Sequence, residues 1–188
     1  AKFDSVIIDE ADKGFDENLR ITKEAVAYAK AKEVLVEAEL GFIGKSSKLL
    51  DEIPEGVSKT TVEEARKFVE ETGIDLFAPA VGNVHGMLKS GLEPKLDIEL
   101  IKQIKEAVRI PLVLHGASGN SDEEIKEAIN AGISIIHINT ELRVAYRKGL
   151  MKSLQASPDE IAPYKYLRPA LKEMESVIEK KLKLFNNL

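Results

Sequence analysis

The chain reads Ile110-Pro-Leu-Val-Leu-His-Gly-Ala-Ser-Gly-Asn-Ser-Asp-Glu-Glu124 at the point that decides its fold. The apolar run from Leu112 to Leu114 is too short for a helix and apolar on both faces, which is typical of a parallel strand covered by helices. His115 and a Gly-Ala-Ser-Gly turn follow it, and Ser121 to Glu124 form a capping box that starts a helix. A ring nitrogen, backbone N–H groups and a helix N-terminus are therefore expected together at the carboxyl end of one strand. Parallel α/β sheets build their sites there.

The composition is that of an ordinary globular protein, with 188 residues, 44% of them hydrophobic and 31% charged. We expect one domain over residues 1–188. A net charge of −5 without a basic cluster argues against a nucleic-acid partner. Because the chain has no cysteine, a metal would need His, Asp or Glu ligands. No membrane span or signal peptide is recognised, so we expect a cytoplasmic protein without a membrane partner.

Short apolar segments alternate with helical patterns along the chain. Strands are predicted over residues 5–9, 34–40, 76–81, 112–114 and 134–139, the first of them buried. Helices are predicted after Asp16, over 62–71, 98–108 and from 122, and again over about 142–155 and 169–184. Five strands that alternate with helices indicate a parallel α/β protein.

All three histidines of the chain fall at or near the ends of successive predicted strands: His85, His115 and His137. A single histidine at such a place is more typical of a hydrogen-bonded structural residue. Three at equivalent positions favour a metal site, because these strand ends converge and imidazole is a common zinc ligand.

Two carboxylates lie on one face of the second strand, since Glu37 and Glu39 are two residues apart. Glu39, at the strand end, is a candidate oxygen ligand or acid/base group. The alternative is a solvated or salt-bridged carboxylate.

Small polar residues at two neighbouring strand ends indicate a phosphate site. They are Gly116, Ser118, Gly119, Asn139 and Thr140. Any tight turn also favours glycine, so the turn alone does not require a phosphate. Lys89 is a candidate cation for the same site, or a solvated surface lysine.

Four segments around these residues resemble the class II, metal-dependent fructose-bisphosphate and tagatose-bisphosphate aldolases. They are Val36-Glu-Ala-Glu-Leu-Gly41, Val81-Gly-Asn-Val-His-Gly86, Pro111-Leu-Val-Leu-His-Gly-Ala-Ser118 and Thr140-Glu-Leu-Arg143. The two His-Gly motifs at this separation are specific, and the resemblance covers nearly the whole chain.

The resemblance implies a TIM (β/α)8-barrel lyase that cleaves a ketose 1,6-bisphosphate into dihydroxyacetone phosphate and glyceraldehyde 3-phosphate. Zinc or another divalent metal, held by three histidines, polarises the ketone. Two of these histidines match His85 and His115, and Glu39 matches an accessory carboxylate. The implied substrate and phosphate contacts are Gly86, Gly116, Ser118, Asn139 and Thr140.

The sequence also departs from the family pattern. The family's third zinc ligand and catalytic Asp lie on an earlier strand, so we expect only about five βα units of the barrel here. Glu10-Ala-Asp12 occupies the positions where the family has Gly-Ser-His. Gly44-Lys-Ser-Ser47 occupies the loop in which the family has an acidic pair. His137 lies where the family has an Asn, and Asn139 lies where the family has an Asp. We hypothesise that His137 serves as the third metal ligand.

Five units leave two open sheet edges, which invite association. The expected partners are another copy of the chain, as a homo-oligomer, or the missing N-terminal segment. We favour a missing N-terminal portion, because the chain begins without Met. The alternative to an active aldolase is a catalytically impaired sugar-phosphate-binding or barrel-completing relative.

Overall fold

The structure, a computed structural model, describes residues 2–46 and 49–186. Ser47, part of the altered loop singled out above, lies outside the described residues. The chain divides into two compact units, Ala1–His137 and Ile138–Leu188. The expectation of one domain over the whole chain stays a prediction.

The first unit contains a five-stranded parallel sheet in the order β1-β2-β3-β4-β5, which follows the order of the sequence. Its strands are β1 (Ser5–Ile8), β2 (Leu35–Leu40), β3 (Leu76–Pro79), β4 (Leu112–Leu114) and β5 (Ile133–Ile136). The predicted parallel α/β architecture with five βα units is therefore confirmed.

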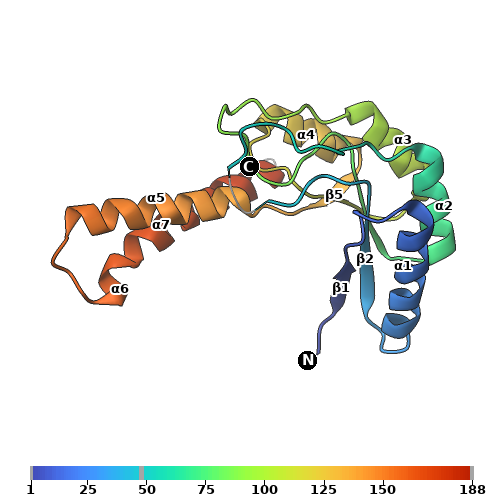
Figure 1. Ribbon diagram of the computed structural model, residues 1–188, viewed down its shortest axis with the longest axis horizontal. Coiled ribbons are helices and arrows are strands. Elements are labelled where there is room, and N and C mark those ends of the chain that lie inside the picture. The colour runs from blue at the N-terminus through green and yellow to red at the C-terminus, as the bar shows by residue number, and fades with distance from the viewer. Residues whose placement is uncertain (1, 47–48, 187–188) are drawn as a thin grey trace. The chain divides into compact units, whose positions relative to one another are not determined.

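Helices connect the strands and form a layer along one side of the sheet (Figure 1). They are α1 (Phe15–Lys30), α2 (Val62–Thr72), α3 (Ile98–Val108) and α4 (Asp122–Ala131). Phe68 of α2 and Phe77 of β3 are fully buried, with ring centroids 6.1 Å apart. Burial of such large apolar side chains joins the helix layer to the sheet.

Side-chain caps set the N-terminal ends of α2, α3 and α4. Thr61 and Ser121 both form the predicted capping boxes, and Gly73 ends α2 in the left-handed conformation. The Asp97 side chain accepts from the Leu100 N–H at the start of α3. The predicted cap of α1 is wrong, because Gly14 is the N-cap. Asp16 lies in the first turn, where its negative charge interacts favourably with the helix dipole.

The first strand is not buried as predicted. Val6 and Ile7 remain 41% and 50% exposed. The reason is that, among the described residues, β1 forms the sheet edge and pairs with β2 alone, so its apolar residues lack a neighbour on the other side.

The second unit is helical and consists of α5 (Thr140–Ala156), α6 (Pro163–Tyr166) and α7 (Arg168–Phe185). The long helices α5 and α7 lie side by side (Figure 1). They approach closely at Gly149, where an added Cβ would lie 2.8 Å from the Ala170 Cα. Lys181 and Glu141 form an ion pair of 3.0 Å between them. No helix in the described part of the chain is both long and apolar enough to cross a membrane.

Candidate metal centre

His115 lies between two buried carboxylates at the carboxyl end of β4. Its Nε2 is 2.8 Å from the Glu37 Oε1, and its Nδ1 is 2.8 Å from the Glu39 Oε1. All three side chains are less than a tenth exposed. One imidazole is thus held from both sides by the acidic pair of β2.

The sheet register brings these three side chains to one face. Glu37 and Glu39 alternate with the buried Val36, Ala38 and Leu40, and β3 places Ala78 opposite Glu39. Because Ala78 is small, it leaves room for the longer glutamate to reach toward β4.

The two carboxylates control the charge of His115. Burial lowers the pKa of the ring, but the hydrogen bonds and charges of Glu37 and Glu39 outweigh burial and raise the pKa to about 9. Without a metal, the ring is therefore an imidazolium at neutral pH. A metal that takes one ring nitrogen must displace a proton.

His85 approaches His115 from the loop after β3. The ring centroids are 5.9 Å apart. The backbone N–H of His85 donates to the Ile43 carbonyl at 2.8 Å, and this hydrogen bond anchors the loop. Burial lowers the pKa of His85, which favours the neutral form that binds metals. His85, His115 and Glu39 offer ligand atoms that all lie within 4.8 Å of one another.

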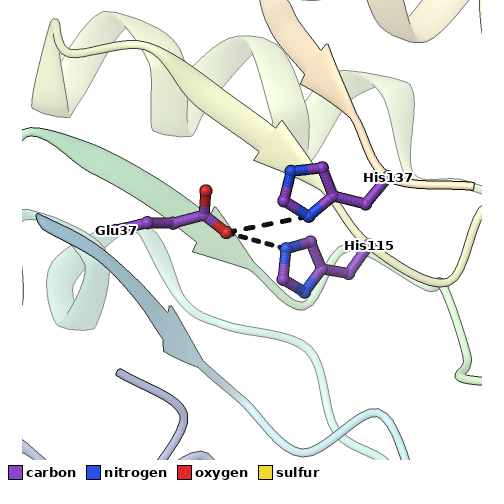
Figure 2. A group of neighbouring side chains, drawn as sticks. All are labelled: Glu37, His115 and His137. Carbon is purple, nitrogen blue, oxygen red and sulfur yellow. Dashed lines mark hydrogen bonds and ion pairs between the residues drawn. The ribbon is translucent and has the colours of Figure 1, made fainter. Parts of the chain in front are cut away.

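The His137 ring lies next to the His115 ring, and both rings face the Glu37 carboxylate (Figure 2). Its ring stacks on His115 with centroids 4.6 Å apart, and its Nδ1 is 3.9 Å from the Glu37 Oε1. Burial lowers the pKa of His137 as well. The prediction that His137 lies within a strand is wrong: β5 ends at Ile136, since β4 offers no strand residue beyond Leu114 to pair with it.

The structure sorts the histidines into two sets that share His115. Glu39, His85 and His115 form one, and Glu37, His115 and His137 form the other. Among residues 2–46 and 49–186, no such set contains all three histidines. Two imidazole nitrogens and one carboxylate oxygen at this spacing fit a zinc-type ion, and each set leaves coordination positions open for water or substrate.

Three supporting residues escaped the sequence interpretation. Glu37 was placed on the face of Glu39 but was not named as a site residue. Asn83 donates from Nδ2 to the His115 carbonyl at 2.8 Å, and Asn18 donates in the same way to the Glu39 carbonyl at 3.0 Å. Both asparagines are buried, and they fix the backbone from which the ligands project.

The predicted phosphate turn follows His115 directly and packs against the preceding loop. Gly116 has φ +59°, and a Cβ there would lie 2.3 Å from the Val84 carbonyl oxygen. Close packing between the loops therefore explains this glycine without a ligand. Gly86 also has a positive φ, of +116°, and Ser118 is buried. The phosphate role of these three residues stays a prediction.

The other predicted substrate contacts have different surroundings. Lys89 is exposed and pairs with Asp51, with the Nζ 2.8 Å from the Oδ1. Asn139 and Thr140 belong to the second unit, as the N-cap and first residue of α5. In the altered loop, Lys45 pairs with Asp12 at 3.1 Å. The roles of Lys89, Asn139 and Thr140 in substrate binding stay predictions.

Comparisons with known proteins agree over nearly the full chain. The family described as "Fructose-bisphosphate aldolase class-II" matches residues 1–188. A fructose-bisphosphate aldolase of Geobacillus stearothermophilus is 40% identical over 187 residues, and a probable fructose-bisphosphate aldolase of Bacillus subtilis is 39% identical over 187. In both cases the alignment covers 100% of this chain but 64% of the relative.

Comparison with solved structures also finds aldolases that are longer than this chain. The YdjI aldolase from Escherichia coli K12 is 38% identical with a TM-score of 0.78, covering 97% of this chain and 61% of that one. A putative fructose-1,6-biphosphate aldolase from Coccidioides immitis is 32% identical with a TM-score of 0.79, covering 98% and 63%. The chain thus spans less than two thirds of the length of these relatives.

Proposed function

Since this chain belongs to the class II fructose-bisphosphate aldolase family, we propose that it acts as a metal-dependent lyase of glycolysis. The reaction is cleavage of a ketose 1,6-bisphosphate, of fructose or tagatose, into dihydroxyacetone phosphate and glyceraldehyde 3-phosphate. The cytoplasmic location expected from the sequence is part of the same proposal.

The convergence of His85, His115 and Glu39 supports this function most strongly. These residues come from three different strand ends, yet their ligand atoms lie within 4.8 Å of one another. They would hold zinc or another divalent ion. When bound, such an ion acts as a Lewis acid that polarises the substrate ketone and stabilises the enediolate charge.

Glu37 acts in this arrangement as a positioning residue. When the Nδ1 of His115 is the ligand atom, the Nε2 retains its proton and donates it to the Glu37 carboxylate. This hydrogen bond fixes the tautomer and the ring orientation, as carboxylates behind metal-bound histidines commonly do. Asn83 and Asn18 hold the backbone of His115 and Glu39 in place.

The substrate phosphate is assigned to the glycine-rich turn and the start of α5. The proposed contacts, which the family resemblance implies, are Gly86, Gly116, Ser118, Asn139 and Thr140. Backbone N–H groups and small hydroxyls suit a phosphate dianion. Lys89 would supply a cation after exchanging Asp51 for the phosphate.

A second candidate is a barrel-completing or sugar-phosphate-binding relative without turnover of its own. The exposed β1 edge favours it, because Val6 and Ile7 of β1 are 41% and 50% exposed. Another polypeptide segment or a second copy of the chain could cover this edge. The family resemblance also assigns a catalytic Asp to a strand that is not among these residues.

The two candidates separate in a cleavage assay. Metal-free protein is supplied with Zn²⁺, fructose and tagatose 1,6-bisphosphate are tested, and dihydroxyacetone phosphate is measured. The assay is repeated with the N-terminal part of the Geobacillus stearothermophilus relative added as a separate polypeptide. Cleavage that EDTA abolishes, alone or with the added part, supports the aldolase. Zinc binding without turnover in either arrangement rejects it in favour of the second candidate.

A further inference from the structure

The two ring nitrogens of His115 face different carboxylates on β2. The Nε2 lies 2.8 Å from Glu37 and the Nδ1 lies 2.8 Å from Glu39. A neutral imidazole has one free lone pair, while its other nitrogen carries a proton. At any moment, therefore, His115 can serve as a ligand on only one of its two sides.

A second set of donors lies on the Glu37 side of this ring. Glu37, His115 and His137 offer ligand atoms that all lie within 4.8 Å of one another, and Glu37 is as deeply buried as Glu39. Figure 2 shows the Glu37 carboxylate turned toward both rings. The 3.9 Å between the His137 Nδ1 and the Glu37 Oε1 is too long for a hydrogen bond. An ion coordinated by both atoms requires no contact between them.

We propose that Glu37, His115 and His137 form a second position for a divalent cation, which is occupied instead of the position at Glu39, His85 and His115. The chain then holds one ion at a time, because both positions use His115 as a ligand. This inference shares His115 with the proposed function, but it does not depend on catalysis.

The donor chemistry selects the class of ion. Two imidazole nitrogens with one carboxylate suit Zn²⁺, Co²⁺ or Ni²⁺, whereas Mg²⁺ and Ca²⁺ prefer oxygen ligands. The His137 side chain is 49% exposed, so water can complete the coordination. The carboxylate that is not a ligand keeps a role in each case: Glu39 accepts the His115 proton when the ion is on the Glu37 side, and Glu37 accepts it in the reverse case.

Exchange between the two positions replaces one histidine and one carboxylate ligand and moves the His115 proton to the other ring nitrogen. His85 and His137 lie on loops that follow β3 and β5, whereas the His115 ring is buried between Glu37 and Glu39. The shared ligand is thus the buried one, and the two alternative ligands are more exposed.

The test is a titration of the metal-free 188-residue chain with Co²⁺, followed by the visible d–d bands and by metal content after gel filtration. The variants are His85→Asn, His137→Asn and the double variant. These two histidines are not the buried partners of the carboxylates, so their replacement leaves the Glu37–His115–Glu39 contacts intact. Far-UV circular dichroism verifies that each variant is folded.

We expect one Co²⁺ per wild-type chain and one per His85→Asn chain, the latter with shifted d–d bands. Adding His137→Asn to His85→Asn should weaken Co²⁺ binding at least about tenfold, because the remaining position loses a direct ligand. Glu52→Gln in the His85→Asn background is the control, since Glu52 belongs to neither set, and it should leave the affinity unchanged.

Two results would overturn the second position: no Co²⁺ bound by His85→Asn, or equal affinities of His85→Asn and the double variant. Two ions per wild-type chain would overturn the alternate occupation of the two positions. None of these readouts depends on turnover. Cleavage by the wild type with no Co²⁺ bound by His85→Asn rejects this inference alone, whereas intact Co²⁺ binding without cleavage rejects only the aldolase.

Discussion

The His115 Nε2 lies 2.8 Å from the Glu37 Oε1, and this contact joins residues that are 78 positions apart in the sequence. Both side chains are buried, and Glu39 holds the other nitrogen of the same ring at the same distance. A buried pair of this kind is costly to disrupt, because removal of one partner leaves an uncompensated group.

Replacement of Glu37 by Gln should therefore lower the free energy of unfolding of the metal-free chain by about 2 kcal/mol, since the hydrogen bond can survive but the charge cannot. Urea unfolding measures this change. The exposed pair of Arg20 and Glu24 offers the control, because Glu24→Gln removes the same charge at the surface and should have little effect. Equal effects of the two substitutions would contradict a stabilising role for the buried pair.

The stability of the metal-free chain should depend on the charge of His115. Its pKa is raised in the folded state to about 9 from an ordinary value of 6.5. The resulting stabilisation is fully present below pH 6.5, declines above it and is lost as the pH rises through about 9. Urea unfolding across this range should show the decline, and His115→Asn should remove it. A His115→Asn chain with the same decline would assign it to another group.

Gly116→Ala should destabilise the fold more than an ordinary loop glycine does. The new Cβ would lie 2.3 Å from the Val84 carbonyl oxygen, and the residue would also keep a positive φ. We expect a loss of about 3 kcal/mol or more in urea unfolding, from the clash and the backbone strain together. Gly91→Ala is the matched control, with φ +70° but nothing within 4 Å, and should lose about 1 kcal/mol. Similar losses of unfolding free energy in both variants would show that the loops move apart to accommodate the methyl group at position 116.

The exposed edge strand should control self-association. Ile7→Lys places a charge on the apolar β1 edge and should shift the chain toward the monomer in sedimentation velocity, since edge charges oppose strand pairing. Ile161→Lys, at a residue 87% exposed outside β1, should leave the mass distribution unchanged. A monomeric wild-type chain would exclude the expected homo-oligomer, and an unaffected oligomer in Ile7→Lys would place its interface elsewhere.

Features set by neighbouring residues in the sequence could be predicted well. The capping boxes at Thr61 and Ser121 and the left-handed Gly73 depend only on their own turns. The alternation of β2 likewise put Glu37 and Glu39 on one face. The family resemblance then named His85 and His115, which the structure brings together.

Features set by distant neighbours could not be predicted in the same way. The pattern of β1 resembles a buried strand, but burial needs a second neighbour that the edge lacks. The role of Glu37 required the register across β3 and β4, which no local pattern contains. His137 falls beyond β5 because the neighbouring strand β4 is short, and only the fold reveals that it joins Glu37 rather than His85.

The most direct test of the shared metal centre is X-ray absorption at the zinc edge of the zinc-loaded chain. We expect a nitrogen and oxygen shell at about 2.0–2.1 Å, with the outer-shell scattering of two imidazole rings. His115→Asn should lose the bound zinc. Zinc bound without imidazole scattering, or a His115→Asn chain that retains its zinc unchanged, would contradict an ion held by His115 at this rim of the sheet.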